Sequence, residues 1–449
     1  MKRSRRAFLK SGLGAALLGL SPGLLRLAIP EAAAAASDYR AAVCIFLHGG
    51  NDANNCVVAL DDTGYRDYQT ARGGLTLPMG SLWPIQTRDS QRSYGLHPEF
   101  RGLHDLYTRG RLAVLANVGT LNAPLTRQEF LAHTGAKPQK LFSHSDQSSQ
   151  WQSPRASRTT REAVGWGGLM ADALAPHNGA AQFPGITTLA ESSLYCEGMV
   201  TRPAAVHPTS LNGLYGFSAN PTHAVRRQAL HRLTGATTGH ALIDTAAAQA
   251  RRMLEQIDVL ESVMAAYPEL QTPFPETDLG RQLRRAAQLI QARDGLGLNR
   301  QLLFVSLGGF DTHKNQLSKQ AALLAQLDAA MTAFYWATEE LGVASQVLSF
   351  TLSEFSRSVS PTGHGSDHGW GSHHFILGGG VRGGDVYGTF PHLELGGPDD
   401  AGDKGRLIPT TAVDQYAATI AAWMGVGAGD IAGMFPNLAN FTQRRLAFV

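Results

Sequence analysis

Short, continuous apolar runs recur along the chain and predict strands that are buried on both faces. Such runs cover residues 41–47, 112–116, 185–189, 300–307, 346–352 and 375–377. Runs of this length without polar alternation are typical of parallel sheets that helices cover on both sides. Helical spacing of apolar residues lies between several of them, over 96–107 and in the long stretch after residue 313. The pattern therefore predicts an α/β protein.

Between about residues 221 and 293 the apolar positions recur at helical spacing instead. The first set is Ala250, Met253, Leu254, Ile257, Leu260 and Met264, and the second is Leu279, Leu283, Ala286 and Ile290. These stripes predict amphipathic helices whose apolar sides are core. We expect a helical insertion that covers one face of the sheet, without site chemistry of its own.

Acidic and histidine side chains directly follow three of the predicted strands. They are Asp52, Asp311, His313, Asp367 and His368. The carboxyl ends of parallel strands meet at one edge of a sheet, which is where open α/β sheets bind ligands. Carboxylate oxygens and imidazole nitrogens are metal ligands, so the sequence predicts a metal site at this edge. Asp52 alone has an equally good alternative, as the cap of a turn or helix.

Histidines are concentrated in the loop that follows the strand at 346–352. Four of the 16 histidines in 449 residues fall within 364–374, where fewer than one would be expected by chance. The last two, His373 and His374, are further candidate ligands. The alternative is a solvated loop with hydrogen-bonded histidines.

A polar, serine-rich segment at 141–152 predicts a helix that begins near Ser143. A hydroxyl at a helix N-terminus faces free backbone N–H groups, which would stabilise a developing alkoxide. Ser143 is therefore the candidate nucleophile, with Ser145 and Thr126 as the other hydroxyls considered. The alternative role of Ser143 is an ordinary helix cap.

Composition and charge exclude several classes of protein. With 43% hydrophobic and 17% charged residues, the chain is too apolar for a disordered protein. The net charge is +3 and no basic run is long enough to indicate a nucleic-acid partner. The length suits one large α/β domain or two smaller ones. The cysteines, Cys44, Cys56 and Cys196, lack CxxC spacing, and we expect buried thiols rather than a disulfide.

The first 36 residues resemble a targeting segment rather than part of the fold. Residues 4–10 read SRRAFLK, a twin-arginine signature, and an apolar segment and an alanine run over 32–36 follow. Pro22, Arg26 and Pro30 interrupt the segment, so a membrane anchor is disfavoured and no stable membrane span is expected. We predict a signal peptide over 1–36, which the twin-arginine translocase reads, and a mature periplasmic or secreted domain over 37–449.

Four motifs together resemble one protein family. They are GGND at 49–52, GGFDTH at 308–313, SEFSR at 353–357 and SDHGWG at 366–371. They are similar to exported proteins catalogued as domain-of-unknown-function family 1501, within the alkaline-phosphatase-like and sulfatase-like superfamily. The resemblance implies a three-layer α/β/α sandwich with a mostly parallel sheet. It also implies a possible two-metal hydrolytic centre, without supplying a substrate.

The resemblance also implies roles for single residues. It would place Asp52, Asp367 and His368 with Ser143 on one ion. It would place Asp311, His313 and either His373 or His374 on the other. The ions would be divalent, with zinc, manganese, magnesium or calcium all compatible with such ligands.

The chemistry expected of such a centre is hydrolysis of phosphate or sulfate esters on small molecules or polymers. Arg357 would neutralise the non-bridging oxygens of the ester, with Glu354 beside it on the same loop. The alternative for Glu354 and Arg357 is a mutual ion pair that fixes the loop. Two other functions remain open: a non-catalytic, metal-binding protein of the cell envelope, and a mononuclear iron oxidoreductase built on Asp311, His313 and another histidine.

Overall fold

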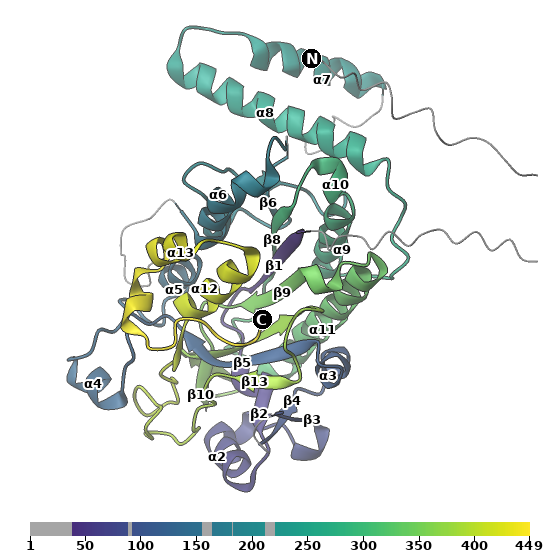
Figure 1. Cartoon of the computed structure of the whole chain (residues 1–449). Helices are drawn as coiled ribbons and strands as arrows, with labels where there is room; N and C mark the ends of the chain where they lie inside the picture. The colour runs from purple at the N-terminus through teal and green to yellow at the C-terminus, as the bar shows by residue number, and fades with distance from the viewer. Residues whose placement is uncertain (1–37, 89–91, 155–163, 182, 212–220) are drawn as a thin grey trace, which may run out of the picture. The chain divides into compact units, whose positions relative to one another are not determined.

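The computed structural model describes residues 38–88, 92–154, 164–181, 183–211 and 221–449. The predicted signal peptide over 1–36 lies outside these residues. Within Tyr39–Val449, which form one unit, the chain is built around a nine-stranded sheet in the order β13-β5-β12-β9-β1-β8-β6-β7, with β14 beside β5 (Figure 1).

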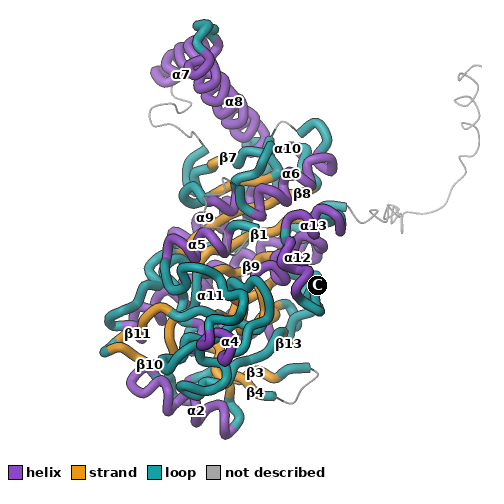
Figure 2. Tube along the Cα trace, turned by 90° about the vertical axis from the view of Figure 1, so that its left-hand side faces the viewer, coloured by secondary structure: helices purple, strands orange, loops and turns teal. Residues whose placement is uncertain are grey.

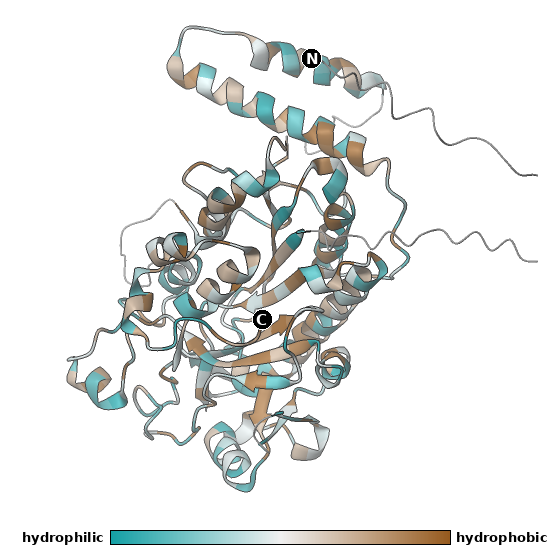
Figure 3. Ribbon diagram, in the orientation of Figure 1, coloured by the Kyte–Doolittle hydropathy of each residue, from teal (hydrophilic) through white to brown (hydrophobic). Residues whose placement is uncertain are grey.

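The strands of this sheet lie close to the predicted apolar runs, and Figure 3 shows several of them in the brown of hydrophobic residues. Their bounds are β1 Arg40–Leu47, β5 Leu112–Gly119, β6 Ile186–Thr188, β7 Ala204–Ala205, β8 Arg300–Leu307, β9 Val347–Leu352, β12 Ser372–Leu377, β13 Asp385–Tyr387 and β14 Thr411–Ala412. All pairings are parallel except those that β12 makes with β5 and β9. The prediction of a mostly parallel sheet is therefore confirmed.

Alternate residues of β1 belong to two different hydrophobic cores, one on each face of the sheet. Val43 and Ile45 belong to the core that includes residues of α3 Arg101–Thr108, α9 Asp278–Gln291 and α11 Gln316–Glu340. Cys44 and Phe46 belong to the other core. Its helices are α5 His144–Gln152, α6 Trp166–Asn178, α12 Val413–Met424 and α13 Ala428–Met434. The two cores give the predicted α/β/α sandwich.

The structure contains further helices and strands in addition to this sandwich. The helices are α1 Ala53–Cys56, α2 Asp62–Arg72, α4 Arg127–Ala132, α7 Pro221–Gly235, α8 Ala241–Met264 and α10 Arg293–Leu296. The strands are β2 Val57–Ala59, β3 Trp83–Gln86, β4 Ser93–Leu96, β10 Arg357–Thr362 and β11 Gly365–His368. The segment after residue 221 is helical, and α7 and α8 lie side by side in both views (Figures 1 and 2). Met253 of the first predicted stripe is not core, because its side chain is 41% exposed.

The cysteines and one predicted helix can be compared directly with the described part of the chain. Cys44, Cys56 and Cys196 are buried and free, as predicted. The helix predicted over 96–107 begins later, at Arg101, because Leu96 belongs to strand β4. None of the described helices is long and apolar enough to cross a membrane.

A buried carboxyl in α12 generates a prediction about stability. Asp414 is almost inaccessible, and its Oδ2 has no hydrogen-bond partner in the described residues. Burial raises the pKa of Asp414 to about 7, whereas an unfolded chain gives aspartate a pKa of about 3.9. The folded state therefore binds this proton more tightly, and the stability that it contributes is lost as the pH rises from about 4 to about 7.

We expect Asp414→Asn to abolish this loss, because an amide is neutral at every pH. The unfolding free energy of the variant relative to wild type should rise by up to about 4 kcal/mol between pH 4 and pH 7 and then level off. Urea unfolding at a series of pH values measures the difference. A difference that stays constant over this range would show that Asp414 does not titrate as described.

Candidate metal centre

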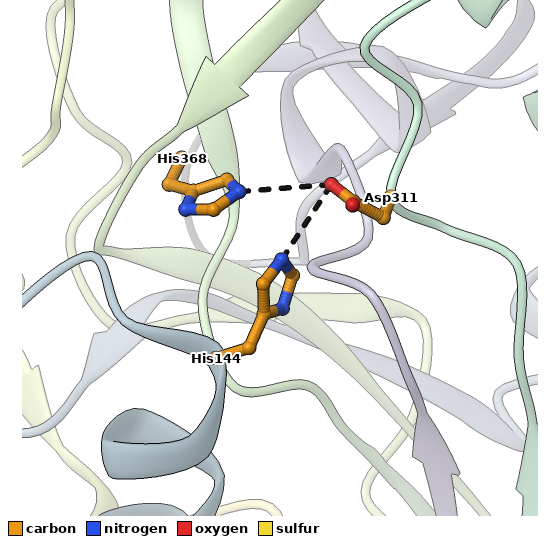
Figure 4. A group of neighbouring side chains, drawn as sticks. All are labelled: His144, Asp311 and His368. Atoms are coloured by element: carbon orange, nitrogen blue, oxygen red, sulfur yellow. Dashed lines mark ion pairs between the residues drawn. The ribbon is translucent and has the colours of Figure 1, made fainter.

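Three side chains from separate elements converge at the carboxyl edge of the sheet (Figure 4). His144 is the first residue of α5, Asp311 follows β8, and His368 ends β11. One ligand atom from each lies within 4.8 Å of the other two. Nε2 of His144 is 3.5 Å and Nε2 of His368 is 3.6 Å from Oδ1 of Asp311. These are the atoms that a single metal ion could bind together.

A hydrogen bond to Glu354 fixes the ring of His144. Its Nδ1 lies 2.8 Å from Oε1 of Glu354, whose side chain is only 3% exposed. A carboxylate can only accept, so Nδ1 carries a hydrogen and Nε2 points at Asp311. That Nε2 is buried and has no hydrogen-bond partner in the described structure. The hydrogen bond to Glu354 outweighs partial burial and raises the pKa of His144.

A backbone carbonyl fixes the ring of His368 in the same way. Its Nδ1 lies 2.7 Å from the carbonyl oxygen of Phe142 and must donate to it. Partial burial lowers the pKa of His368, which keeps a lone pair on Nε2 at neutral pH. Metal-binding histidines characteristically donate their other ring nitrogen to a carboxylate or a carbonyl. His144 donates to the carboxylate of Glu354, and His368 donates to the carbonyl of Phe142.

His313 lies beside the same carboxylate, as predicted. Its Nε2 is 2.9 Å from Oδ1 of Asp311 and 3.2 Å from Nε2 of His368. The side chain is 46% exposed. His313 could therefore add a third imidazole nitrogen to the group.

Arg357 holds Asp311 from the interior. Its Nη1 donates to Oδ1 of Asp311 at 2.7 Å and to the carbonyl of Gly49 at 3.2 Å, and its Nη2 donates to the carbonyl of Ser366. Burial alone would raise the pKa of Asp311, but the hydrogen bond and charge of Arg357, together with the nearby His313 and His144, lower the pKa, so the side chain is a carboxylate at neutral pH. The guanidinium is 0% exposed, which favours positioning over direct substrate contact.

In the described structure, Glu354 and Arg357 do not form the ion pair that was considered as their alternative role. Glu354 accepts from His144 and, at 2.8 Å, from the backbone N–H of Gly49. Arg357 instead pairs with Asp311. Glu354 and Arg357 of the SEFSR motif thus each fix a different member of the cluster.

Asp52 lies apart from this group, buried against other partners. Its carboxylate forms an ion pair with Arg72, accepts from Gln316, and accepts at 3.2 Å from the backbone N–H of Asn54 as the N-cap of α1. The helix-cap alternative for Asp52 is therefore the one that the structure shows.

The other predicted ligands are also engaged elsewhere. Asp367 accepts from Nη2 of Arg406 at 3.0 Å. His373 and His374 lie inside β12, which begins three residues earlier than predicted, and both are buried. Nδ1 of His373 accepts from the backbone N–H of Asn117 at 3.0 Å. His374 packs edge-on against Trp151. The structure does not bring these three side chains into the group around Asp311.

Ser143 is the N-cap of α5, the alternative role considered for it. Its hydroxyl donates to Oδ2 of Asp146 at 2.6 Å. It directly precedes His144, so the predicted nucleophile lies next in sequence to a candidate ligand. Thr126 caps α4 in a capping box, and Ser145 is exposed.

The residue that sequence reasoning missed is His144. It does not follow a strand of the sheet, which was the pattern that pointed to the other ligands. The available signal was a histidine directly after a serine that was itself expected to begin a helix.

Comparisons with known proteins identify a family. The model described as "Protein of unknown function (DUF1501)" matches residues 39–403, which confirms the resemblance drawn from the four motifs. No curated protein matches the chain.

Solved structures show weaker likenesses. The crystal structure of Ps i-CgsB in complex with k-i-k-neocarrahexaose is 10% identical, with 91% of this chain and 77% of that chain covered and a TM-score of 0.38. The lipoteichoic acid synthase LtaP from Listeria monocytogenes is 8% identical, with 89% and 76% covered and a TM-score of 0.34. The PsFucS1 sulfatase from Pseudoalteromonas sp. is 10% identical, with 84% and 71% covered and a TM-score of 0.33. These likenesses carry no argument about activity.

The position of Asp52 predicts a stability effect without loss of metal ligands. Asp52→Ala would leave Arg72 buried and unpaired, which costs about 3–5 kcal/mol of unfolding free energy. Asp105→Ala is the matched control, because its ion pair with Arg109 is about half exposed and should cost less than about 1 kcal/mol. Urea unfolding measures both. Equal stability of the two variants, or loss of bound metal from folded Asp52→Ala protein, would contradict this role.

Proposed function

We propose that this chain, which belongs to the family of unknown function DUF1501, is a metal-dependent hydrolase of phosphate or sulfate esters. The observation that carries the proposal is the convergence of two ring nitrogens on Asp311. Both rings have their other nitrogen already committed, to Glu354 and to the carbonyl of Phe142. Rings held in this way point Nε2 toward the carboxylate, where a metal ion would displace the proton from a protonated ring and bind both nitrogens.

The residues present fit a divalent ion. Nε2 of His144 is buried without a hydrogen-bond partner in the described structure, which is costly unless another group satisfies it. The donor set is imidazole nitrogen and carboxylate oxygen. It suits zinc or manganese better than calcium or magnesium, which prefer oxygen alone. His144, Asp311 and His368 would hold the ion, and exposed His313 is the candidate for a fourth position.

The site also leaves room for a ligand. The side chains of Asp311 and His313 are 47% and 46% exposed, so the cluster is open to solvent. A divalent ion there would supply positive charge to the oxygens of an ester and to an attacking group. The chain's own contribution is positional: Glu354 orients His144, Phe142 orients His368, and Arg357 holds Asp311 as a carboxylate.

We propose one ion for this cluster. The described residues contain one group of at least three such ligands, and it takes Asp311 and His368, which the family resemblance assigned to different ions. A second ion remains a prediction from the resemblance.

Ser143 remains the proposed nucleophile. Asp146 accepts its hydroxyl hydrogen, and that hydrogen bond lowers the pKa of Asp146. Asp146 is therefore a carboxylate at neutral pH and could take the proton as Ser143 attacks. The bond that forms joins Ser143 Oγ to phosphorus or sulfur, and the bond that breaks joins that atom to the alkoxide of the ester, which takes a proton from Asp146 and leaves as the alcohol. Water then attacks the seryl ester, which releases phosphate or sulfate and restores the Ser143 hydroxyl.

A second candidate is a metal-binding protein of the cell envelope without turnover. Two observations favour it. The guanidinium of Arg357 is wholly buried, and the hydroxyl of Ser143 caps a helix. Both groups would then have structural roles alone. For either function, the SRRAFLK sequence supports export through the twin-arginine translocase to the periplasm or beyond, where a small-molecule or polymeric partner would be met.

Removal of ligands should remove the metal. We expect His144→Ala and His368→Ala each to lower affinity for zinc or manganese by at least about tenfold, because a small site loses one of its few donors. His104→Ala is the control, since His104 lies on the far helix α3 and bonds the carbonyl of Pro84. Elemental analysis after equilibrium dialysis measures bound metal. Wild-type metal content in both site variants would refute the centre.

The two functions differ in their dependence on Ser143. If the chain is a hydrolase with this nucleophile, Ser143→Ala should lower turnover of an activated aryl phosphate or sulfate by about 10³-fold or more. Metal content should stay near wild type. Ser145→Ala is the matched control. Equal loss in both, or full activity in Ser143→Ala, would remove Ser143 from this role, and no turnover by metal-loaded wild type would favour the binding protein.

A further inference from the structure

A small cavity lies beside the cluster. Its volume is about 130 Å³, and its lining residues are Phe130, Phe142, Ala401, Gly402, Asp403, Lys404 and Arg406. The cavity has room for several water molecules and for a single phosphate or sulfate group.

Two residues of the cavity lining contact His368 of the cluster. The carbonyl of Phe142 accepts from Nδ1 of His368 at 2.7 Å, and Nε of Arg406 donates to the carbonyl of His368 at 3.0 Å. Nη2 of Arg406 donates to Asp367 at 3.0 Å. A group bound in the cavity would therefore lie next to His368. One molecule could place one of its groups in the cavity and another at the cluster.

The cavity walls carry free positive donors. Lys404 is exposed, and neither its Nζ nor Nη1 of Arg406 makes a hydrogen bond in the described residues. The guanidinium of Arg406 is fixed over the ring of Phe142, with its carbon 4.3 Å from the ring centroid. Asp403 is the one acidic residue of the lining.

The loop that carries these donors is ordered by a buried carboxylate. Asp400 is 0% exposed and accepts from the backbone N–H groups of Gly396, Gly402, Gly405 and Arg406, at 3.0, 3.0, 2.8 and 3.0 Å. Arg127 adds hydrogen bonds to the carbonyls of Asp400 and Gly402. A loop held in this way pays little further ordering cost when an anion binds.

We infer that this cavity binds a phosphate or sulfate group, with Lys404 as its specificity-determining residue. Charge-assisted hydrogen bonds from an ammonium and a guanidinium are the usual means of recognising such a group. If the proposed function holds, on which this step rests, the group belongs to the substrate. The substrate class is then an ester that carries at least two phosphate or sulfate groups, one at the cluster and one in the cavity.

The test uses the full mature chain freed of metal with a chelator, so that anion binding at a metal cannot contribute. Equilibrium dialysis with radioactive sulfate, and separately with inorganic phosphate, is carried out at constant ionic strength. We expect about one saturable site per chain, and Lys404→Glu should weaken it by at least about tenfold. Arg252→Glu is the matched charge reversal, on α8 and outside the cavity lining. It should bind like wild type.

His144→Ala separates this inference from the proposed function. It should lose metal affinity yet bind the anion like wild type, because His144 does not line the cavity. Absence of saturable binding of either anion to the wild type would overturn the inference. Equal affinities in Lys404→Glu and Arg252→Glu would also overturn it, provided that circular dichroism shows both folded. Anion binding by a wild type that takes up no metal would support the cavity and refute the proposed metal centre.

Discussion

One carboxylate oxygen, Oδ1 of Asp311, organises the candidate centre. The Arg357 guanidinium approaches it at 2.7 Å and His313 at 2.9 Å, and the ring nitrogens of His144 and His368 face it at 3.5 and 3.6 Å. Arg357 is buried and holds Asp311 in its charged form. The two rings depend on Glu354 and on the carbonyl of Phe142 for their orientation. The geometry of the centre therefore depends on a small number of interactions with Asp311, and neighbouring groups hold the His144 and His368 rings in place.

The surrounding sheet explains why these few interactions suffice. Its strands β8 and β9 run parallel on either side of β1, so the loops after them begin at the same edge. The hairpin of β10 and β11 then returns His368 to that edge. Behind it, the buried pair of Asp52 and Arg72 and the hydrogen bond from Gln316 tie the first loop to α2 and α11. Two hydrophobic cores hold this framework, so the site residues need not stabilise the fold.

Much of this arrangement could be predicted from the sequence, because parallel strands impose a common edge on the loops after them. Asp311, His313 and His368 were found by that rule. His144 was not, because it comes from a helix that packs over the edge, and such packing leaves no periodic signal. His373 and His374 were misplaced in a loop because glycines precede them, whereas β12 already begins at Ser372. The partners of Asp52 depend on side chains 20 and 264 residues away, which no local pattern reveals.

Anomalous X-ray diffraction from crystals grown with zinc or manganese would locate the ion itself. We expect one strong peak per chain, at about 2.0–2.2 Å from Nε2 of His144, Nε2 of His368 and a carboxylate oxygen of Asp311. A peak near Asp52, His373 or His374 instead, or no peak at this cluster in metal-saturated crystals, would contradict it.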